Sequence, residues 1–586
     1  MNYSSKDNIR LWLIENSVFN HIIIFTRNHL PKKARIGALT YIFLSLVQTV
    51  LDLFAFSLFI PVIIFIIDSS LLQLDNQYLN FLNFYISDYL NDVPKLFGIF
   101  FVIFFIKYIL SFLINIFQIK YSYNLIATTR SSLLEKYTRL DYMSVLKMKS
   151  NVITNGLILN VERAIEVFFI NFLHFVKSTI HIIIFTVFLA TINFNITVWM
   201  ALISSSILII YYLFIKTKIT NFGKKKYNYN SIFVKNIQDI YGGFHIIKLF
   251  KLENKIINLF KIKSLNYARI SSIYKILITF PKISKEIILL TLLIGLFFLL
   301  EFLNYSDNEI SNYITIFGII GLRLFPQLLL MFNTVGNIKH SQFSMETLNK
   351  ELSEFDKKKE KSFIEIPIEK SIELKNISFN YGDENKEIFK DLNFKISTGE
   401  IIGLEGENGT GKSTFLKVIS GLIKPSKGEI IIDDKKLNNF ENYNWQNNIS
   451  YVEQNVFLFN DTILQNITLN EEKYNKEKLD KIIAGINLRD FIELQDEGLN
   501  KVIAENNSNV SGGEKQKIAI CRALYRNCKF ILFDESLSNI DEKSVLIIKD
   551  YLKSIKDIGI IIISHKKSTL SFCDKVYNLK NKKFNI

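Results

Sequence analysis

The chain has 586 residues and a formal net charge of +15 at pH 7, and 49% of its residues are hydrophobic. Its length exceeds what one hydrophobic core usually supports, so we expect at least two domains. The hydrophobic content, which includes 51 Phe, excludes an ordinary soluble protein and favours a membrane protein. The charge does not imply a nucleic-acid partner, because basic membrane proteins concentrate Lys and Arg in cytoplasmic loops.

The N-terminal segment, residues 8–31, mixes apolar and charged positions. This pattern predicts a helix that lies along the inner surface of the membrane. A seventh, partial span is the alternative, but Arg10, Glu15 and Arg27 interrupt the apolar run. The segment has charges inside its first apolar stretch and no small-residue cleavage site, so we expect no removable signal peptide.

Six apolar segments are long enough to cross a bilayer, which requires about 20 residues. They are residues 37–67, 93–118, 165–192, 196–216, 276–303 and 311–336. The loops after the second and fourth segments are rich in Lys and Arg, whereas residues 69–92 contain three Asp and neither Lys nor Arg. The positive-inside rule therefore predicts that both termini and the two basic loops are cytoplasmic.

Ionisable side chains inside the predicted spans are costly in hydrocarbon, so each is a candidate to line a translocation path. Arg323 lies roughly 18 Å into the last span at helical rise, too deep to reach an interface easily. In the third span Asn171, His174, Lys177 and His181 recur every three or four residues and share one helix face. The alternative for this stripe is polar contact between helices.

Further lysines add positive charge, namely Lys107 in the second span and Lys282 and Lys285 in the fifth, which Asp52 and Glu286 offset in part. The alternative for these lysines is that they extend to the inner headgroups. A basic cavity suits an anionic cargo. The candidate cavity residues are Arg323, Lys177, His174, His181 and Lys107.

The segment 400–420 contains GENGTGKS, a GxxxxGKS motif between a strand-like and a helix-like stretch. This context predicts a phosphate-binding loop for ATP, in which Lys412 reaches the β and γ phosphates and Ser413 ligates Mg²⁺. The candidate nucleotide-binding residues here are Gly406, Glu407, Asn408, Gly409, Thr410, Gly411, Lys412, Ser413 and Thr414.

Two carboxylates follow a second apolar strand in FILFDES, residues 530–536. We expect Asp534 to hold the magnesium shell and Glu535 to orient and polarise the attacking water. An acidic strand end without chemistry is the alternative, and the preceding phosphate-binding loop disfavours it.

Between these motifs lies VSGGEKQK, residues 510–517, which resembles the signature of ABC transporters. The resemblance extends in order over residues 371–586. It implies that Ser511 and Gly513 bind the γ-phosphate of a nucleotide held by a partner's phosphate-binding loop. The other matching residues are Gly512 and Glu514 of the signature, Tyr381 for adenine stacking, Gln454 of the Q-loop for Mg²⁺ and γ-phosphate, Glu505 for contact with the membrane domain, Asp541 of the D-loop and the switch histidine His565.

The sequence departs from the family pattern at a few positions. Val510 replaces a usual Leu, Glu514 a usual Gln and Asn507 a common Gly, and SNID stands for SALD. These changes remove neither a phosphate ligand nor the general base. The resemblance therefore implies catalysis by Glu535 and His565, and a homodimer with two competent sites.

The order of the parts resembles the exporter class of ABC transporters. The expected fold is a six-helix, all-α transmembrane domain in residues 1–340, a linker in 341–370 and an α/β P-loop ATPase domain in 371–586. The cytoplasmic loops should carry short helices that dock on the ATPase domain, at about 140–149 and 241–252.

Within exporters, the chain resembles the bacterial flippase for lipid-linked oligosaccharides of N-linked glycosylation. The stretches that carry this resemblance are LFAFSLFIPVIIF, LQLDNQYLNFLNFYISDYLND, FHIIKLFKLENKIINLF and ITIFGIIGLRLFPQLLL, the last with Arg323. It implies a polyprenyl-pyrophosphate-linked glycan as cargo, an inner-membrane location and a cytoplasmic ATPase domain. The alternative cargoes are a lipid A-type lipid, a peptide or a small hydrophobic compound, and the alternative class is an ATP-gated channel or regulator.

Overall fold

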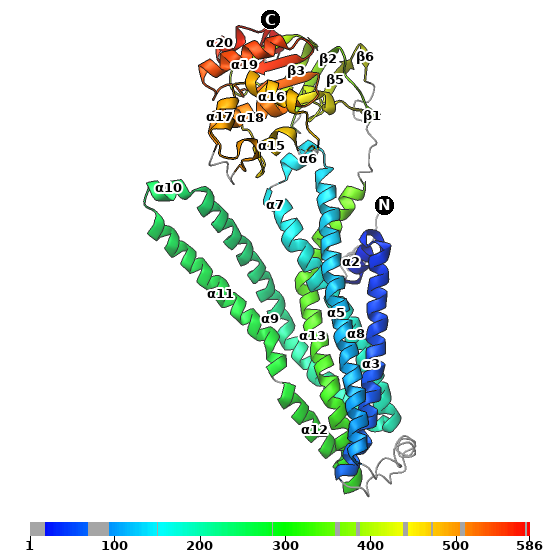
Figure 1. Ribbon diagram of the computed structural model, residues 1–586. Helices are drawn as coiled ribbons and strands as arrows, with labels where there is room; N and C mark the ends of the chain where they lie inside the picture. Colours follow the sequence, from blue (N-terminus) through cyan, green and yellow to red (C-terminus); the bar gives the residue numbers. More distant parts are fainter. Residues whose placement is uncertain are drawn as a thin grey trace, which may run out of the picture. The chain divides into compact units, whose positions relative to one another are not determined.

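The chain folds into two compact units, each described by itself here (Figure 1). The computed structural model describes residues 18–67, 93–148, 150–283, 285–357, 364–381, 387–437, 443–469, 471, 473–503, 510–580 and 583–585. The first unit comprises residues 1–139 and 148–357, and the second comprises residues 140–147 and 358–586.

The described part of the first unit is helical. Its elements are α2 (Val18–Ile24), η1 (Phe25–His29), α3 (Lys32–Ile67), α5 (Val93–Thr138), α7 (Ser150–Asn155), η3 (Gly156–Asn160), η4 (Arg163–Ile170), α8 (Asn171–Ile192), α9 (Phe194–Gly242), α10 (Phe244–Leu249), α11 (Glu253–Ile283), α12 (Lys285–Phe302) and α13 (Asp307–Lys357). The six predicted spans fall largely within α3, α5, η4 with α8, α9, α11 with α12, and α13, and several of these helices extend well beyond the predicted bounds.

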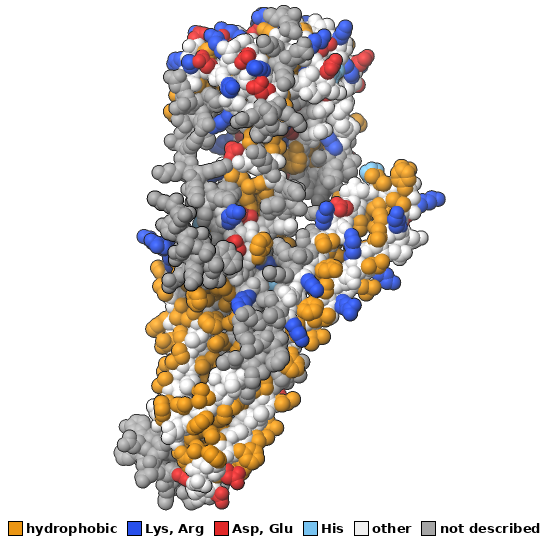
Figure 2. Space-filling model, turned by 180° about the vertical axis from the view of Figure 1, so that it is seen from behind, with side chains coloured by type: hydrophobic (Ala, Val, Ile, Leu, Met, Phe, Trp, Pro, Cys, Tyr) orange, Lys and Arg blue, Asp and Glu red, His pale blue; other side chains and the backbone are white. Residues whose placement is uncertain are grey.

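Four of the described helices are long and apolar enough to cross a membrane. They are Lys32–Ser57, Phe97–Thr138, Ile153–Ile192 and Asp307–Ser353, and the shorter Phe194–Ser206 is also apolar. Many large hydrophobic side chains on these helices, such as Phe101 and Phe112, are exposed within the single chain. Figure 2 shows such side chains covering the helices of this unit. Surface of this kind requires lipid or another protein to cover it.

The structure changes the bounds of the predicted linker and describes only part of the predicted surface helix. The predicted linker 341–370 is not one connecting segment, because α13 continues to Lys357. The helix persists since Met345, Leu348 and Leu352 recur at helical spacing and are buried. At its other end, Ile368 is buried in the second unit. The described part of the predicted surface helix 8–31 forms α2 and η1, and residues 8–17 lie outside the described residues.

Within the first unit, α9 and α11 pair along their length and form an arm that ends in α10 (Figure 1). Apolar side chains on and beside α10 are largely exposed, including Phe244, Leu249 and Phe250. The arm also carries many Lys side chains, which Figure 2 shows in blue beside the hydrophobic ones. A cytoplasmic loop is expected to be basic in this way.

The second unit contains a six-stranded sheet in the order β12-β11-β4-β10-β9-β8, in which all neighbours are parallel except β11 and β12. A four-stranded antiparallel sheet has the order β3-β2-β5-β6, and β1 pairs with β7. The strands are β1 (Ile364–Glu365), β2 (Ser371–Asn380), β3 (Glu387–Ser397), β4 (Ile401–Glu405), β5 (Lys427–Ile432), β6 (Lys435–Lys436), β7 (Tyr443–Asn444), β8 (Ile449–Val452), β9 (Phe530–Asp534), β10 (Gly559–Ile563), β11 (Lys575–Lys580) and β12 (Lys583–Asn585).

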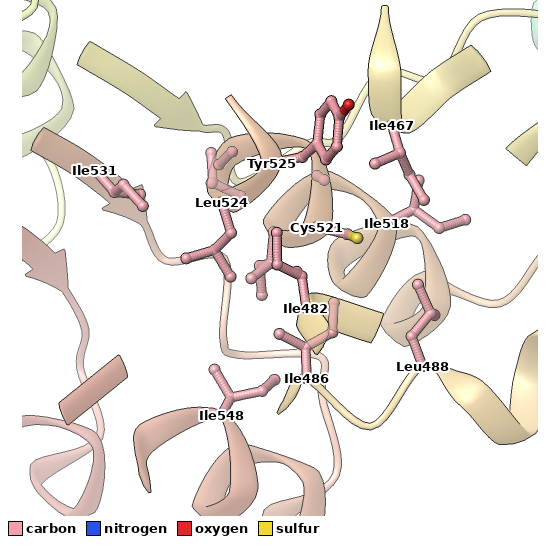
Figure 3. Packing of buried hydrophobic residues seen from close by; sticks show 14 of the residues in the cluster. Ile467, Ile482, Ile486, Leu488, Ile518, Cys521, Leu524, Tyr525, Ile531 and Ile548 are labelled. Carbon is pink, nitrogen blue, oxygen red and sulfur yellow. The ribbon is translucent and has the colours of Figure 1, made fainter. Parts of the chain in front are cut away.

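The helices of this unit pack into two separate hydrophobic cores. The helices are α6 (Tyr142–Lys147), α14 (Lys412–Ile419), α15 (Ile463–Thr468), α16 (Lys476–Gly485), α17 (Arg489–Glu493), α18 (Gly512–Tyr525), α19 (Glu542–Ser554) and α20 (Lys567–Leu570), with short 3₁₀ turns η6 (Gln446–Asn448) and η7 (Gly498–Asn500). One core joins α14 to the four-stranded sheet, and Tyr142 and Met143 of α6 pack against it. The other core joins α15, α16, α18 and α19, and part of it is shown in Figure 3.

Candidate functional site

The candidate site lies at one edge of the six-stranded sheet. The order β4-β10-β9-β8 makes these strands parallel neighbours, so their carboxyl ends meet at one edge. Each end leads into a predicted site segment: the phosphate-binding loop after β4, His565 after β10, Asp534 and Glu535 at the end of β9, and Gln454 after β8. The carboxyl edge of a parallel sheet is the usual place for a ligand site. Sheet topology therefore gathers motifs that are far apart in the sequence.

The phosphate-binding loop connects β4 to α14 and includes Glu407, Asn408 and Thr410. Gly411 caps α14 with a φ of +103°, and a Cβ there would lie 2.5 Å from Ile388. Only glycine therefore fits this turn without strain. The N-terminal N–H groups of α14 point toward the loop and suit phosphate oxygens.

Lys412 is folded onto its own loop. Its Nζ donates to the carbonyl oxygens of Gly406 at 2.7 Å and Glu407 at 2.8 Å. Burial lowers the pKa of Lys412, and the carboxylates of Glu535 and Asp534 oppose this effect. The ammonium is thus held where the loop curls, close to where phosphates are expected to bind.

Asp534 is buried and uses both carboxylate oxygens. Ser413 Oγ donates to Oδ1 at 2.9 Å, and Tyr451 OH donates to Oδ2 at 2.7 Å. The hydroxyl of Ser413 and the carboxylate of Asp534 are therefore adjacent, as the sequence analysis expects for a magnesium shell. The contact of Tyr451 was not anticipated, because a tyrosine within a strand has no distinguishing pattern.

Glu535 connects the other two candidate residues of this edge. Gln454 Nε2 donates to Glu535 Oε2 at 2.9 Å, and His565 Nε2 lies 3.0 Å from Oε1. Glu535 has a φ of +51°, the left-handed region that a non-glycine residue occupies at some cost. Strained backbone of this kind often accompanies function.

The residues at this edge fit Mg²⁺ bound together with a nucleotide. Ser413, Asp534 and Gln454 offer oxygen atoms, the ligands that Mg²⁺ prefers. Among the described residues, no three His, Cys, Asp or Glu side chains gather into a protein-only metal site. Mg²⁺ held by one or two side chains and by phosphates is the usual arrangement in nucleotide sites.

Tyr381 lies near the phosphate-binding loop at the end of β2. Its OH is 3.1 Å from Thr414 Oγ1, and its ring packs edge to face on Phe379 with centroids 4.9 Å apart. The ring is 44% exposed, which leaves a face for stacking a flat base.

The signature motif starts α18, in the other core of the unit. Ser511 caps this helix and accepts from the Glu514 backbone N–H at 3.3 Å, while Glu514 Oε2 accepts from the Ser511 N–H at 2.7 Å. This capping box explains why the departure from Gln at 514 is tolerated, since both residue types serve at this position. A Cβ at Gly513 would lie 3.0 Å from the Asn539 carbonyl oxygen, and Gly512 precedes it in the first turn.

Asp541 caps α19 and accepts from the Ser544 backbone N–H at 2.8 Å. This hydrogen bond lowers the pKa of Asp541, with a smaller contribution from Lys517. The described contacts of Ser511 and Asp541 stay at the starts of α18 and α19: Ser511 pairs with Glu514, and Asp541 contacts Ser544 and, at 3.8 Å, Lys517. Glu505 and Asn507 lie outside the described residues.

The candidate cavity residues lie on three helices of the first unit, α5, α8 and α13, and each of these helices packs against α3. Lys107 is buried and forms an ion pair with Asp52 at 2.6 Å. The same Phe56 ring lies 4.8 Å from Lys107 Nζ and 4.4 Å from the Arg323 guanidinium carbon. Lys107 is therefore neutralised inside the helices, and it does not extend to headgroups as the alternative proposed.

The third-span stripe makes contacts between helices. Lys177 donates to Gln48 Oε1 at 2.9 Å. His174 lies 3.2 Å from Tyr41 OH and 2.8 Å from Gln118 Nε2. His181 differs, because it stacks on Phe185 of its own helix with ring centroids 4.5 Å apart.

Asn171 continues this pattern of interhelical contact by accepting from Asn337 Nδ2 at 3.2 Å. The stripe therefore contributes polar contacts between helices, the alternative reading of the sequence. The side chains of Lys282 and Lys285 lie outside the described part of the chain.

Comparison with known proteins bears on both units. Residues 389–538 match the family model "ABC transporter", which makes this part of the chain an ABC transporter ATPase domain. A solved structure described as a bacterial Atm1-family ABC exporter with ATP bound aligns with a TM-score of 0.75 at 18% identity and covers 95% of both chains. The predicted fold class, a helical membrane domain followed by a P-loop ATPase domain, is confirmed.

Curated relatives are similar over part of their length. An "ATP-dependent lipid A-core flippase" of Wigglesworthia glossinidia brevipalpis is 33% identical over 46% of this chain and 47% of its own. The protein of the same name from Escherichia coli strain K12 is 30% identical over 51% and 52%. The "Multidrug resistance-like ATP-binding protein MdlA" of Buchnera aphidicola is 31% identical over 62% and 64%. The chain thus aligns with about half to two thirds of the length of these relatives.

Proposed function

We propose that this chain, an ABC ATPase domain joined to an exporter-type helical domain, is one half of a transporter that hydrolyses ATP to move an anionic lipid across a membrane. The observation that carries the proposal is the hydrogen-bonded set at the sheet edge, in which Gln454, Glu535 and His565 adjoin the Ser413–Asp534 pair. A domain that only binds nucleotide has no need of this arrangement. The location that follows is the bacterial inner membrane, with the ATPase domain in the cytoplasm.

Each residue of the set has a role in hydrolysis. Glu535 accepts a hydrogen bond from the attacking water and orients it toward the γ-phosphate, and His565 fixes the Glu535 carboxylate from one side. Lys412 stabilises charge on the phosphates through its ammonium group. Ser413 and Gln454, with Asp534 beside Ser413, would hold Mg²⁺, which would neutralise charge on the phosphate oxygens.

A second copy of the chain completes the proposed site. The phosphate-binding loop and Ser511 belong to different cores of one ATPase domain, so a partner's Ser511 is the expected γ-phosphate ligand. The exposed apolar side chains around α10, such as Phe244 and Leu249, suit contact with a protein surface. Because one chain carries every motif, two identical copies suffice.

Complementation between two inactive variants tests the shared site. In Lys412→Ala the phosphate-binding loop is impaired, and in Ser511→Arg the signature is blocked. We expect each variant alone to be inactive and a co-expressed mixture to regain hydrolysis, because the mixed dimer contains one intact site. If each chain formed its site alone, the mixture would stay inactive, and this result would contradict the homodimer.

The cargo proposal rests on the charges of the helical domain. Among the described residues, neither Arg323 nor Lys177 forms an ion pair with a carboxylate, and the single carboxylate of Asp52 pairs with Lys107 while its charge also acts on Lys177. Uncompensated cations within membrane helices favour an anionic headgroup. The similarity to relatives named for lipid A-core supports a lipid A-type lipid as the first cargo to test. A polyprenyl-pyrophosphate-linked oligosaccharide, to which the sequence resemblance pointed, is the second.

Reconstitution in liposomes tests the cargo. Labelled lipid A and labelled lipid-linked oligosaccharide are incorporated in parallel, and ATP-dependent loss of outer-leaflet label is measured. Liposomes with Glu535→Gln serve as the control for hydrolysis-independent movement. Movement of only one lipid identifies the cargo. Movement of neither, with hydrolysis stimulated by a peptide, would overturn the lipid proposal, and movement that persists in Glu535→Gln would favour a channel or regulator.

A further inference from the structure

Tyr451 lies on β8, three residues before Gln454, and contacts the magnesium-site carboxylate directly. Its OH donates to Asp534 Oδ2 at 2.7 Å, and the Ser413 hydroxyl donates to Oδ1 at 2.9 Å. The phenol side chain is half-buried and packs against the hydrophobic core that includes α14 and the four-stranded sheet. The Tyr451 ring thus packs on apolar side chains, while its hydroxyl hydrogen-bonds to one oxygen of the Asp534 carboxylate.

From this geometry we infer that Tyr451 is a positioning residue, which fixes the rotation of the Asp534 carboxylate so that Oδ1 faces Ser413. The inference rests on the proposed binding of ATP with Mg²⁺ at this edge. An Asp side chain has a broad preference at its last torsion, so the protein must select the orientation by other contacts. Residues that orient metal-site carboxylates commonly affect metal affinity as strongly as some direct ligands.

The surroundings of Tyr451 keep its hydroxyl a donor. Burial is the main cause that raises the pKa of Tyr451 far above its ordinary value, and the negative charge of Asp534 raises it further. The phenol therefore stays protonated at any physiological pH. The hydroxyl is therefore available as the donor in its hydrogen bond to Asp534 Oδ2.

The same core also receives α6. Tyr142 and Met143 of this short helix pack against the cluster that contains Tyr451, and Lys417 Nζ of α14 lies 5.6 Å from the Tyr142 ring centre. Thus α6 touches both the helix that follows the phosphate-binding loop and the core around Tyr451. The positioning hydroxyl is therefore anchored in a packed region and not in a free loop.

Metal binding in a variant that does not hydrolyse ATP tests the inference. In full-length Glu535→Gln, with and without Tyr451→Phe, we measure Mn²⁺ binding in the presence of ATP by electron paramagnetic resonance. We expect Tyr451→Phe to weaken Mn²⁺ binding about tenfold. We also expect ATP binding in EDTA to change less than about twofold, because the hydroxyl acts only through Asp534. In the hydrolysing enzyme the Mg²⁺ concentration for half-maximal rate should rise about tenfold while kcat at saturating Mg²⁺ is largely kept.

Tyr577→Phe is the matched control, since Tyr577 packs against the same core and its ring contacts Phe394 and Phe584. It should leave Mn²⁺ binding unchanged. Equal Mn²⁺ affinity in Tyr451→Phe and its parent would overturn the inference. Loss of Mn²⁺ binding together with loss of ATP binding in EDTA would also contradict it, since that result indicates a general structural role. Because binding is measured without turnover, these outcomes are separate from a failure of the proposed transport function.

Discussion

The two units place their polar groups in different ways. In the ATPase domain, β4, β10, β9 and β8 bring their polar ends to one edge, where the Ser413–Asp534–Tyr451 and Gln454–Glu535–His565 contacts form. In the helical domain, ionisable residues come from the middle of several helices, and Lys107 and Lys177 each have one partner on a neighbouring helix. Backbone topology therefore fixes the first site, whereas individual side-chain pairs fix the second. Single substitutions in the first site should therefore each cause a large loss of activity. Substitutions in the second should have effects whose size differs from one side-chain pair to the next.

The sharpest test of this contrast is Glu535→Gln. Removing the carboxylate while keeping the shape should lower the hydrolysis rate by about 10²–10⁴-fold, the usual contribution of a general base. ATP binding should persist, because the described hydrogen bonds of Glu535 are to Gln454 and His565, and the contacts that shape the phosphate-binding loop stay in place. Steady-state hydrolysis and equilibrium ATP binding measure the two effects. A rate equal to that of the parent would remove Glu535 from catalysis.

The stability of the helical domain should depend on the buried ion pair between Asp52 and Lys107. Asp52→Asn leaves Lys107 buried without a counter-charge, so we expect destabilisation of about 3–5 kcal/mol, measured by thermal unfolding in detergent. The double variant Asp52→Asn with Lys107→Met should recover much of this loss. Glu135→Gln is the control, since the exposed Glu135–Arg139 pair should contribute less than about 1 kcal/mol. Equal effects of the two single variants would contradict a buried pair.

Substitution of Arg323 should affect transport and hydrolysis differently. Arg323→Ala should reduce lipid movement about tenfold, the size expected for one charged contact, and leave basal hydrolysis nearly unchanged. Arg323→Lys, which keeps the charge but loses the planar group over Phe56, should fall between parent and Ala. The measurement is movement of labelled lipid in liposomes beside the hydrolysis rate. Unchanged transport in both variants would leave Arg323 a structural role.

The smallest effect concerns the signature. Glu514→Gln should change ATPase-domain stability by less than about 0.5 kcal/mol, because Gln preserves the capping box with Ser511. Glu514→Ala removes one side of the box and should cost about 1 kcal/mol. Thermal unfolding compares the three proteins. A larger loss in Gln than in Ala would contradict the capping role.

The sequence predicted the ATPase domain in detail because its motifs have fixed spacing and lie where strands end. Gly411, Asp534 and His565 each have a backbone or charge requirement that a pattern can express. Tyr451 had no such pattern, since an aromatic residue in a strand usually only packs. The sequence therefore located Asp534 and the segment around β8. It could not predict the contact between Tyr451 and Asp534, because that contact depends on the direction in which the tyrosine side chain points.

The helical domain was predicted less completely. Apolar length identified the spans, and periodicity placed His174, Lys177 and His181 on one helix face. Periodicity cannot tell which neighbouring helix faces that side, so the contact of Lys177 with Gln48 was not foreseen. The continuation of α13 to Lys357 was also missed, because the helix beyond the membrane is mostly polar and only a sparse apolar stripe stabilises it.

The ammonium of Lys412 already has two oxygen acceptors in its own loop, the carbonyls of Gly406 and Glu407. The phosphate oxygens of an incoming triphosphate must therefore replace these carbonyl oxygens as hydrogen-bond acceptors. The net binding free energy contributed by the lysine is then smaller than its charge suggests. The same two hydrogen bonds hold the lysine side chain against the curve of the loop, so the shape of the loop and the position of its cation depend on each other.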